Sequence, residues 1–309
     1  MSLGSSASPE TWHAGIHEKV AIVTDSIAQI PAALVKKYGI HVIPYRVTVA
    51  EKTYTDGVDL SVDELYKRMR VEKDVRLMTT APSVGLFCKT FGDCREEGAR
   101  RILYIGVSGN LSGAVNSATA ASRMIYTDFG AVQITIFDSH MATIAQGFLA
   151  LDAARMADEG AGVEEIVQHI SEERKNVGFI AGFETLEYLA RGGRIGKAAY
   201  LLSDAIKVVP LVTLNDDGEV IPVAKVFGHA KMMTEMIRYV KEHAGTSSIL
   251  SVAIMHADTP EWAEQLRQMA VDELHPDEVF ITDFTPVMVA HTGPGIIGIA
   301  YHCRPQAAP

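Results

Sequence analysis

The sequence is poor in the features that mark several large classes of protein. It contains only three cysteines, an odd number that is too small for a disulfide framework. No run of about 18 apolar residues occurs, so a membrane-spanning helix is not expected. The formal net charge of −10 argues against a surface that binds nucleic acid and against more than transient contact with a membrane. We therefore expect a cytoplasmic protein with reduced thiols.

Sequence motifs of the common catalytic and cofactor sites are also missing. No Walker loop occurs, and Gly106, Gly109 and Gly113 have the wrong spacing for a dinucleotide fingerprint. Neither Ser108 nor Ser112 lies in the Gly-x-Ser-x-Gly turn of hydrolases. No cluster of cysteine and histidine has the spacing of zinc ligands. We therefore predict no catalytic residues, no metal and no cofactor, and a protein that is not an enzyme.

The first half of the chain alternates short β-branched runs with amphipathic helical stretches. Strands are predicted at residues 20–24, 40–49, 101–107 and 131–137, with helices between them. This βαβα order predicts a parallel sheet flanked by helices, and the loops that follow its strands form the ligand-binding edge.

The second half has a different character. Two β-rich runs, 208–214 and 220–227, flank the sequence Asn215-Asp216-Asp217-Gly218, which is typical of a turn between antiparallel strands. Strand and helix patterns follow it to the end of the chain. The second half is therefore predicted to contain a mixed sheet.

The length of 309 residues suits two domains. We place an N-terminal α/β domain at 18–170 and a C-terminal α/β domain, with the mixed sheet, at 171–309. Residues 1–17 are rich in Ser, Gly and Ala and are predicted to be a disordered lead-in or a segment added for expression.

Two loops before predicted helices combine small residues with hydroxyls: Thr79-Thr80-Ala81-Pro82-Ser83 and Ser108-Gly109-Asn110-Leu111-Ser112-Gly113. The start of a helix has unpaired amides and a positive dipole end, so it can hold one anionic group without a lysine. Each loop alone is also typical of simple N-capping by Ser and Thr. Two such loops at one edge of a sheet favour a carboxylate or phosphate site.

Three further motifs have both a functional and a structural interpretation. Asp25-Ser26 and Asp138-Ser139 follow predicted strands, where they suit metal or acid chemistry, or an Asx turn. His291-Thr292-Gly293-Pro294-Gly295, between predicted extended segments, is either part of a site or a tight turn. Arg191-Gly192-Gly193-Arg194 either binds a partner or a phosphate, or complements the end of a short helix.

Taken in order, these pieces resemble the DegV family of bacterial fatty-acid-binding proteins, over residues 18–303. The matching stretches are Thr24-Asp25-Ser26, Tyr54-Thr55-Asp56-Gly57-Val58-Asp59, Thr79-Thr80-Ala81-Pro82-Ser83, Leu111-Ser112-Gly113, Asp138-Ser139, Leu186-Glu187-Tyr188-Leu189-Ala190-Arg191-Gly192-Gly193-Arg194-Ile195, Ile206-Lys207-Val208-Val209-Pro210 and His291-Thr292-Gly293-Pro294-Gly295. No single motif is decisive, but the ordered set is specific.

The resemblance implies a two-domain α/β protein that buries a long-chain fatty acid, palmitate-like or stearate-like, in an apolar tunnel. Hydroxyls and helix N-terminal amides would hold its carboxylate. The residues implied in this contact are Thr79, Thr80, Ser112, Gly113 and His291.

Asp25, Ser26 and Ser108 are candidates for an additional site. Members of the family present the bound acid to a separate fatty acid kinase catalytic subunit, which forms an acyl phosphate. The resemblance therefore makes Arg191 and Arg194 candidates for the surface that docks this partner. The chain itself would be a carrier.

The chain departs from the family pattern at four positions. Ala81 and Ala114 stand where Gln and Thr are usual, and Thr143 and Ala145 replace the usual Ser and Gly. The hydroxyls of the two loops are retained, so the resemblance still implies a head-group site.

Two other functions remain open. The family fold is similar to part of the dihydroxyacetone kinases, so a small-molecule kinase or phosphatase could hold a phosphate in the same hydroxyl loops. Turnover of a nucleotide by the isolated chain would favour that alternative. A purely regulatory interaction protein would instead lack a buried ligand and expose a large apolar patch.

Overall fold

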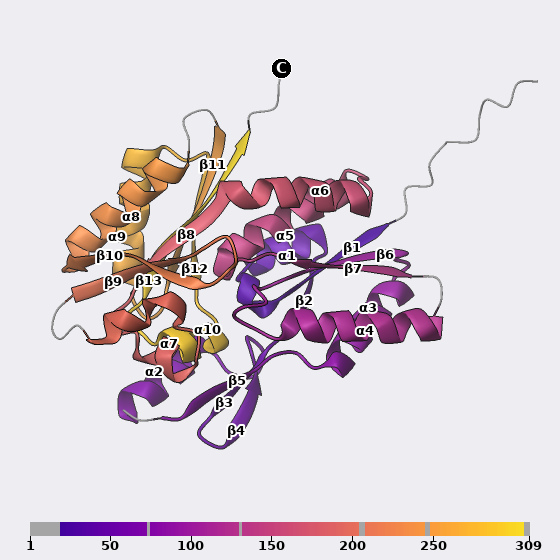
Figure 1. The fold of residues 1–309 in the computed structure, drawn as a ribbon, viewed down its shortest axis with the longest axis horizontal. Helices are drawn as coiled ribbons and strands as arrows, with labels where there is room; N and C mark the ends of the chain where they lie inside the picture. Colours follow the sequence, from indigo (N-terminus) through magenta and orange to yellow (C-terminus); the bar gives the residue numbers. More distant parts are fainter. Residues whose placement is uncertain (1–18, 73–74, 130–131, 204–207, 245–247, 306–309) are drawn as a thin grey trace, which may run out of the picture.

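The computed structural model describes residues 19–72, 75–129, 132–203, 208–244 and 248–305. The predicted lead-in at 1–17 lies outside the described residues. These residues form three sheets and the helices that cover them (Figure 1). This α/β architecture, with one parallel and one mixed sheet, confirms the predicted fold class.

The parallel sheet is formed by the first half of the chain, in the order β2-β1-β6-β7. Every neighbouring pair in it is parallel, as the βαβα alternation predicts. Its strands are β1 (Val20–Asp25), β2 (His41–Ile43), β6 (Arg101–Gly106) and β7 (Gln133–Asp138).

Helices cover both faces of this sheet (Figure 1). One face is covered by α3 (Val84–Glu96) and α4 (Ala114–Phe129), and the other by α1 (Ala32–Tyr38), α5 (Thr143–Asp158) and α6 (Val163–Glu173). The Ser83 hydroxyl caps α3 by accepting the Leu86 amide at 3.3 Å, so this helix begins at Val84.

The mixed sheet has the order β10-β9-β8-β13-β11-β12, in which β11 and β12 form a parallel pair and the other pairs are antiparallel. Its strands are β8 (Val177–Gly182), β9 (Val208–Leu214), β10 (Val220–Phe227), β11 (Ser248–His256), β12 (Glu278–Asp283) and β13 (Ile297–Pro305). Helices α8 (His229–His243) and α9 (Pro260–Leu274) cover its outer face, and α5 contacts its inner face (Figure 1). The predicted hairpin pairs β9 with β10, as expected.

A small antiparallel sheet was not expected from the sequence. It consists of β3 (Arg46–Val49), β4 (Lys52–Thr55) and β5 (Leu77–Thr80). Helix α2 (Val62–Val71) is linked to it by Arg68, which donates to the Tyr54 hydroxyl at 2.7 Å. The predicted run at 40–49 is therefore divided between two sheets, because the chain leaves the parallel sheet after β2. Thr79 and Thr80 lie in a strand and not in a loop.

His291 and Thr292 are the last two residues of a helix, so the chain before the predicted turn is helical and not extended, whereas Pro294 and Gly295 form a turn ahead of β13. Thr285 caps α10 (Pro286–Thr292), and Pro286 occupies its first turn, where the missing amide costs nothing. Helix α10 packs on β3, β5 and α7 (Glu187–Arg191), between the mixed sheet and the small sheet (Figure 1). A C-terminal helix thus lies on an N-terminal sheet.

Helix α5 is the central element between the two large sheets. Its residues from Thr143 to Ala154 are buried on every side, and it contacts β1, β6, β8 and β13. Gly147 allows the chain after β1 to approach, because a Cβ there would lie 2.4 Å from the Ala28 carbonyl oxygen. One continuous core therefore joins the two halves, and the domain boundary near residue 170 stays a prediction.

The tip of the β9–β10 hairpin is held by polar side chains from the first half. The Ser108 hydroxyl donates to the Gly218 carbonyl at 2.9 Å, and the Asn110 amide donates to the Asp217 carbonyl at 2.7 Å. The His140 ring lies 2.7 Å from the Asp216 carbonyl oxygen. These contacts fix the hairpin against the edge of the parallel sheet.

Candidate functional site

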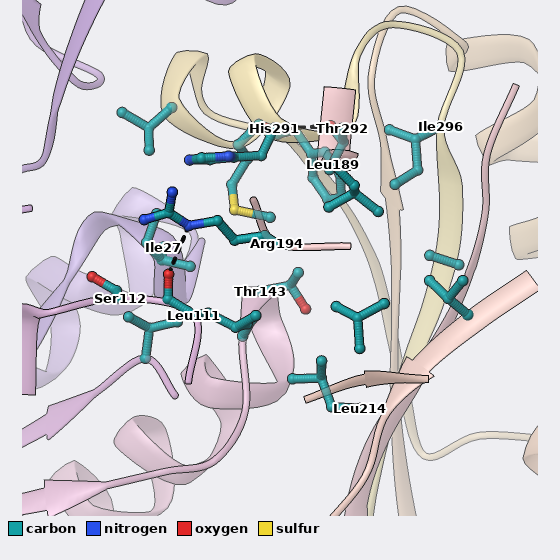
Figure 2. Close-up of a pocket in the computed structure, with 18 of the residues that line it drawn as sticks. Ile27, Leu111, Ser112, Thr143, Leu189, Arg194, Leu214, His291, Thr292 and Ile296 are labelled. Carbon is teal, nitrogen blue, oxygen red and sulfur yellow. Dashed lines mark hydrogen bonds between the residues drawn. The ribbon is translucent and has the colours of Figure 1, made fainter. Parts of the chain in front are cut away.

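A mostly apolar cavity lies where the three sheets meet α5 and α10. The space between its walls measures about 890 Å³, which includes space open to solvent. Its walls come from the chain after β1 and β6, the start of α5, the inner face of the mixed sheet, and α10 (Figure 2). Side chains such as Phe179, Leu189, Met255, Phe284 and Val287 make the interior apolar.

Hydroxyl and ring groups gather at one part of this cavity. The Thr79 hydroxyl lies 2.7 Å from Nε2 of His291, and the Ser112 hydroxyl lies 2.6 Å from the hydroxyl of Tyr45. Ser112 also accepts the Ala114 amide at 3.2 Å at the start of α4. All four side chains line the cavity. The fold thus joins four segments that are far apart in the sequence into one group of hydrogen-bonding atoms.

Arg194 places a positive charge beside this group. Its Nε donates to the Leu111 carbonyl at 3.0 Å (Figure 2). Its Nη1 donates to the Gly192 carbonyl. Both acceptors are backbone carbonyls, so no carboxylate neutralises the guanidinium in these two contacts. An anion in the cavity would therefore experience a favourable potential.

The titratable groups of the cluster are held neutral. Burial, and then the nearby charge of Arg194, lowers the pKa of His291 from 6.5 to about 4. Burial also raises the pKa of Tyr45 well above its ordinary value. At neutral pH the cavity therefore presents uncharged donors next to one arginine, which suits a single carboxylate.

A second hollow, open to the outside, adjoins the cavity at this cluster. Thr79, Arg194 and His291 line both spaces. The outer hollow measures about 1,120 Å³, which includes space open to solvent, and Arg76 and Arg191 add positive charge to its wall. The polar end of the cavity is thus the end that faces a basic depression on the surface.

Comparison with known proteins assigns the chain to a family. The model of the family described as "Uncharacterised protein, DegV family" matches residues 19–304. The chain belongs to the DegV family. A DegV domain-containing protein of Caldanaerobacter subterraneus subsp. tengcongensis is 33% identical to it over 284 residues, which are 92% of this chain and 99% of the relative.

Solved structures of DegV proteins have the same fold. A fatty-acid-binding DegV family protein from Thermus thermophilus matches with a TM-score of 0.86 and 25% identity, over 92% of this chain and 99% of that one. DegV of Bacillus subtilis, described as a fatty acid binding protein, matches with a TM-score of 0.81 and 27% identity, over 93% and 99%. The predicted membership in the family is confirmed.

The structure places the predicted head-group residues of this DegV protein in two groups. Thr79, Ser112 and His291 line the cavity together. Thr80 is exposed, because successive side chains of β5 point to opposite faces. Gly113 immediately precedes α4 and is exposed. No contact with a ligand tests these roles, so all five assignments stay predictions.

The additional candidates Asp25 and Ser26 make hydrogen bonds within the protein. The Asp25 carboxylate accepts from the Tyr104 hydroxyl at 2.7 Å and from the Val107 amide at 3.1 Å. Ser26 donates to Asp56 at 2.6 Å. Burial raises the pKa of Asp25. These contacts, like that of Ser108 with the hairpin, fit a structural role, and a further site at these residues stays a prediction.

The two docking candidates differ in their surroundings. Arg191 is exposed on α7 and makes a surface ion pair with Glu187 at 3.5 Å. Arg194 is partly buried and lies against the cavity. Only Arg191 is therefore free to reach across to another protein without breaking contacts of the fold.

Sequence reasoning missed Tyr45, which contacts Ser112 across 67 positions of the chain. The only local signal was Pro44-Tyr45 inside a run predicted as one strand.

Among the residues that the structure describes, no group of three or more His, Cys, Asp or Glu side chains could hold a metal ion. In the same residues, no helix is both long and apolar enough to span a membrane.

Proposed function

We propose that this DegV protein binds a long-chain fatty acid, palmitate-like or stearate-like, with its chain in the cavity and its carboxylate at Thr79 and Ser112. The observation that carries the proposal is the arrangement of the cavity, which is mostly apolar and has neutral donors and Arg194 at the end facing the outer hollow. Its structural relatives from Thermus thermophilus and Bacillus subtilis, described as fatty-acid-binding, support the same ligand class.

The apolar walls supply the affinity. Transfer of about 15 methylenes from water at about 0.8 kcal/mol each gives on the order of 12 kcal/mol of gross free energy. Ordering the chain and losing its freedom consume part of this, and the rest permits tight retention. The head group then needs orientation more than attraction, which hydroxyls provide at a low desolvation cost.

We infer that the chain is a cytoplasmic carrier and not an enzyme. The carboxylate would lie at the boundary with the outer hollow, where a fatty acid kinase catalytic subunit could reach it and form an acyl phosphate. Arg76 and Arg191 on the wall of that hollow suit the negative charge of a phosphoryl donor or of the partner's surface.

The head-group assignment predicts that Ser112→Ala and Thr79→Val each weaken palmitate binding at least tenfold. Each variant removes one hydrogen bond to a charged group, which contributes about 1.5–3 kcal/mol. The measurement is displacement of a fluorescent fatty acid at pH 7. Thr80→Val is the matched control, because Thr80 is exposed on the same strand, and its affinity should be unchanged. Equal losses in Thr79→Val and Thr80→Val would refute the assignment.

The docking assignment predicts that Arg191→Ala lowers acyl phosphate formation by a bacterial fatty acid kinase subunit about tenfold at limiting carrier. Arg191 is exposed, and its surface ion pair with Glu187 contributes little to the stability of the fold. The substitution should therefore leave fatty acid binding unchanged. Arg267→Ala on α9, which removes another surface ion pair, is the control. If both variants react like the wild type, Arg191 has no role in docking.

A further inference from the structure

A buried polar side chain in the cavity wall, that of Thr143, lies outside the proposed head-group site. Thr143 is the first residue of α5, is 3% exposed and lines the cavity. Its hydroxyl oxygen is buried and has no hydrogen-bond partner among the described residues. A buried hydroxyl without a partner is costly, since it has lost its bonds to water. Such a group in the wall of a ligand cavity points to a partner that the ligand supplies.

The start of α5 adds backbone amides to the Thr143 hydroxyl. The first amides of a helix have no partner within the helix, and the N-cap of α5 is Ala142, whose side chain accepts no hydrogen bond. Ala142 and Thr143 both line the cavity, so the positive end of α5 is directed at it. Thr143 has φ of +59°, which is unfavourable for a β-branched residue, so a threonine is present here despite a conformational cost.

This polar position is separate from the head-group cluster. In the view of Figure 2, the apolar side chain of Leu111 lies between Ser112 and Thr143, and the Thr143 hydroxyl is directed away from Ser112. Neither Thr79 nor Tyr45 nor His291 has a hydrogen bond with Thr143. Thr143 would therefore meet the acyl chain and not the carboxylate.

We propose that the start of α5 is a second polar subsite, which binds a hydroxyl group on the chain of a hydroxylated long-chain acid. A hydroxyl fits both parts of the subsite, because it can donate to Oγ of Thr143 and accept from a first-turn amide. The inference rests on the proposed function and extends its ligand class to acids that carry a hydroxyl along the chain. A plain acyl chain would leave the Thr143 hydroxyl unpaired.

The test compares stearic acid with a series of hydroxystearic acids that differ in the position of the hydroxyl. Affinities are measured by competition for wild type, Thr143→Val and Thr143→Ser. Valine keeps the branched shape and the backbone preference of threonine, so the first variant removes only the hydroxyl. Serine keeps the hydroxyl and serves as the rescue control.

We expect one hydroxystearic acid of the series, or two with hydroxyls on neighbouring carbons, to bind Thr143→Val about tenfold more weakly than the wild type. This is the effect of losing one buried hydrogen bond. Stearic acid should bind Thr143→Val as tightly as wild type or more tightly, and Thr143→Ser should retain the preference of the wild type. The inference is wrong if Thr143→Val changes the affinity of every acid by the same factor. It is also wrong if no hydroxystearic acid depends on Thr143. Failure of the wild type to bind stearic acid would instead overturn the proposed function.

Discussion

Replacing Ala181 by phenylalanine should abolish the retention of long-chain fatty acids while the protein still folds. Ala181 lies on β8, is 2% exposed, and lines the cavity on the inner face of the mixed sheet. A phenyl ring at this position would occupy space that the acyl chain needs. Because the cavity already contains that space, the substitution does not overpack the core. We expect at least a 100-fold loss of palmitate affinity, equivalent to about 2.7 kcal/mol or more.

The measurement is native mass spectrometry of protein purified from a bacterial host, supported by direct titration with palmitate. Circular dichroism and thermal unfolding establish that the variant is folded. Ala181→Val provides a graded control, since it fills less space and should reduce affinity only in part. Recovery of Ala181→Phe with a full complement of bound fatty acid would mean that the acyl chain does not occupy this cavity.

Acid should destabilise the apo protein through His291, by about 3 kcal/mol between pH 6.5 and 4. The pKa of His291 is lowered from 6.5 to about 4 in the folded protein because its ring is buried next to Arg194. Between these values the unfolded chain binds a proton that the folded protein does not, so stability decreases as the pH falls. The contribution is complete above pH 6.5 and is lost as the pH falls to about 4.

His291→Gln tests this expectation, since glutamine does not titrate and can still hydrogen-bond Thr79. The free energy of unfolding, from urea titrations of ligand-free protein at several pH values, should fall less steeply in the variant than in the wild type. Some dependence on pH will remain, because burial also lowers the pKa of His302. His243→Gln, at an exposed position on α8, is the control. Equal slopes for wild type and His291→Gln would contradict the assignment.

Much of the fold could be read from local patterns. The parallel sheet follows from the alternation of β-branched runs with helical stretches, and the β9–β10 hairpin from the turn Asn215–Gly218. The small sheet could not be predicted, because β3, β4 and β5 have four residues each and half of β4 is exposed. Helix α10 was missed for a similar reason, since seven residues are too few for a clear helical period.

Only part of the candidate site could be predicted from the sequence. The hydroxyl loops pointed to Thr79 and Ser112, but the same reasoning included Thr80, which the pleat of β5 directs away from the cavity. Tyr45 had no motif of its own. Thr143 was noticed only as a departure from the family pattern, because its missing hydrogen-bond partner is a property of its surroundings.

The sequence by itself determined the α/β class, the order of the main elements, the family and the types of polar group available for an anion. These depend on periodicity, turns and caps, which act between residues close in the chain. Only the tertiary structure decided which of those groups meet. The pairing of Thr79 with His291 across 212 positions results from the packing of α10 on the small sheet. The pairing of Ser112 with Tyr45 across 67 positions joins the segment before α4 to the segment between β2 and β3. The cavity exists because side chains from the three sheets do not fill the space between them, and a local sequence pattern cannot predict such a space.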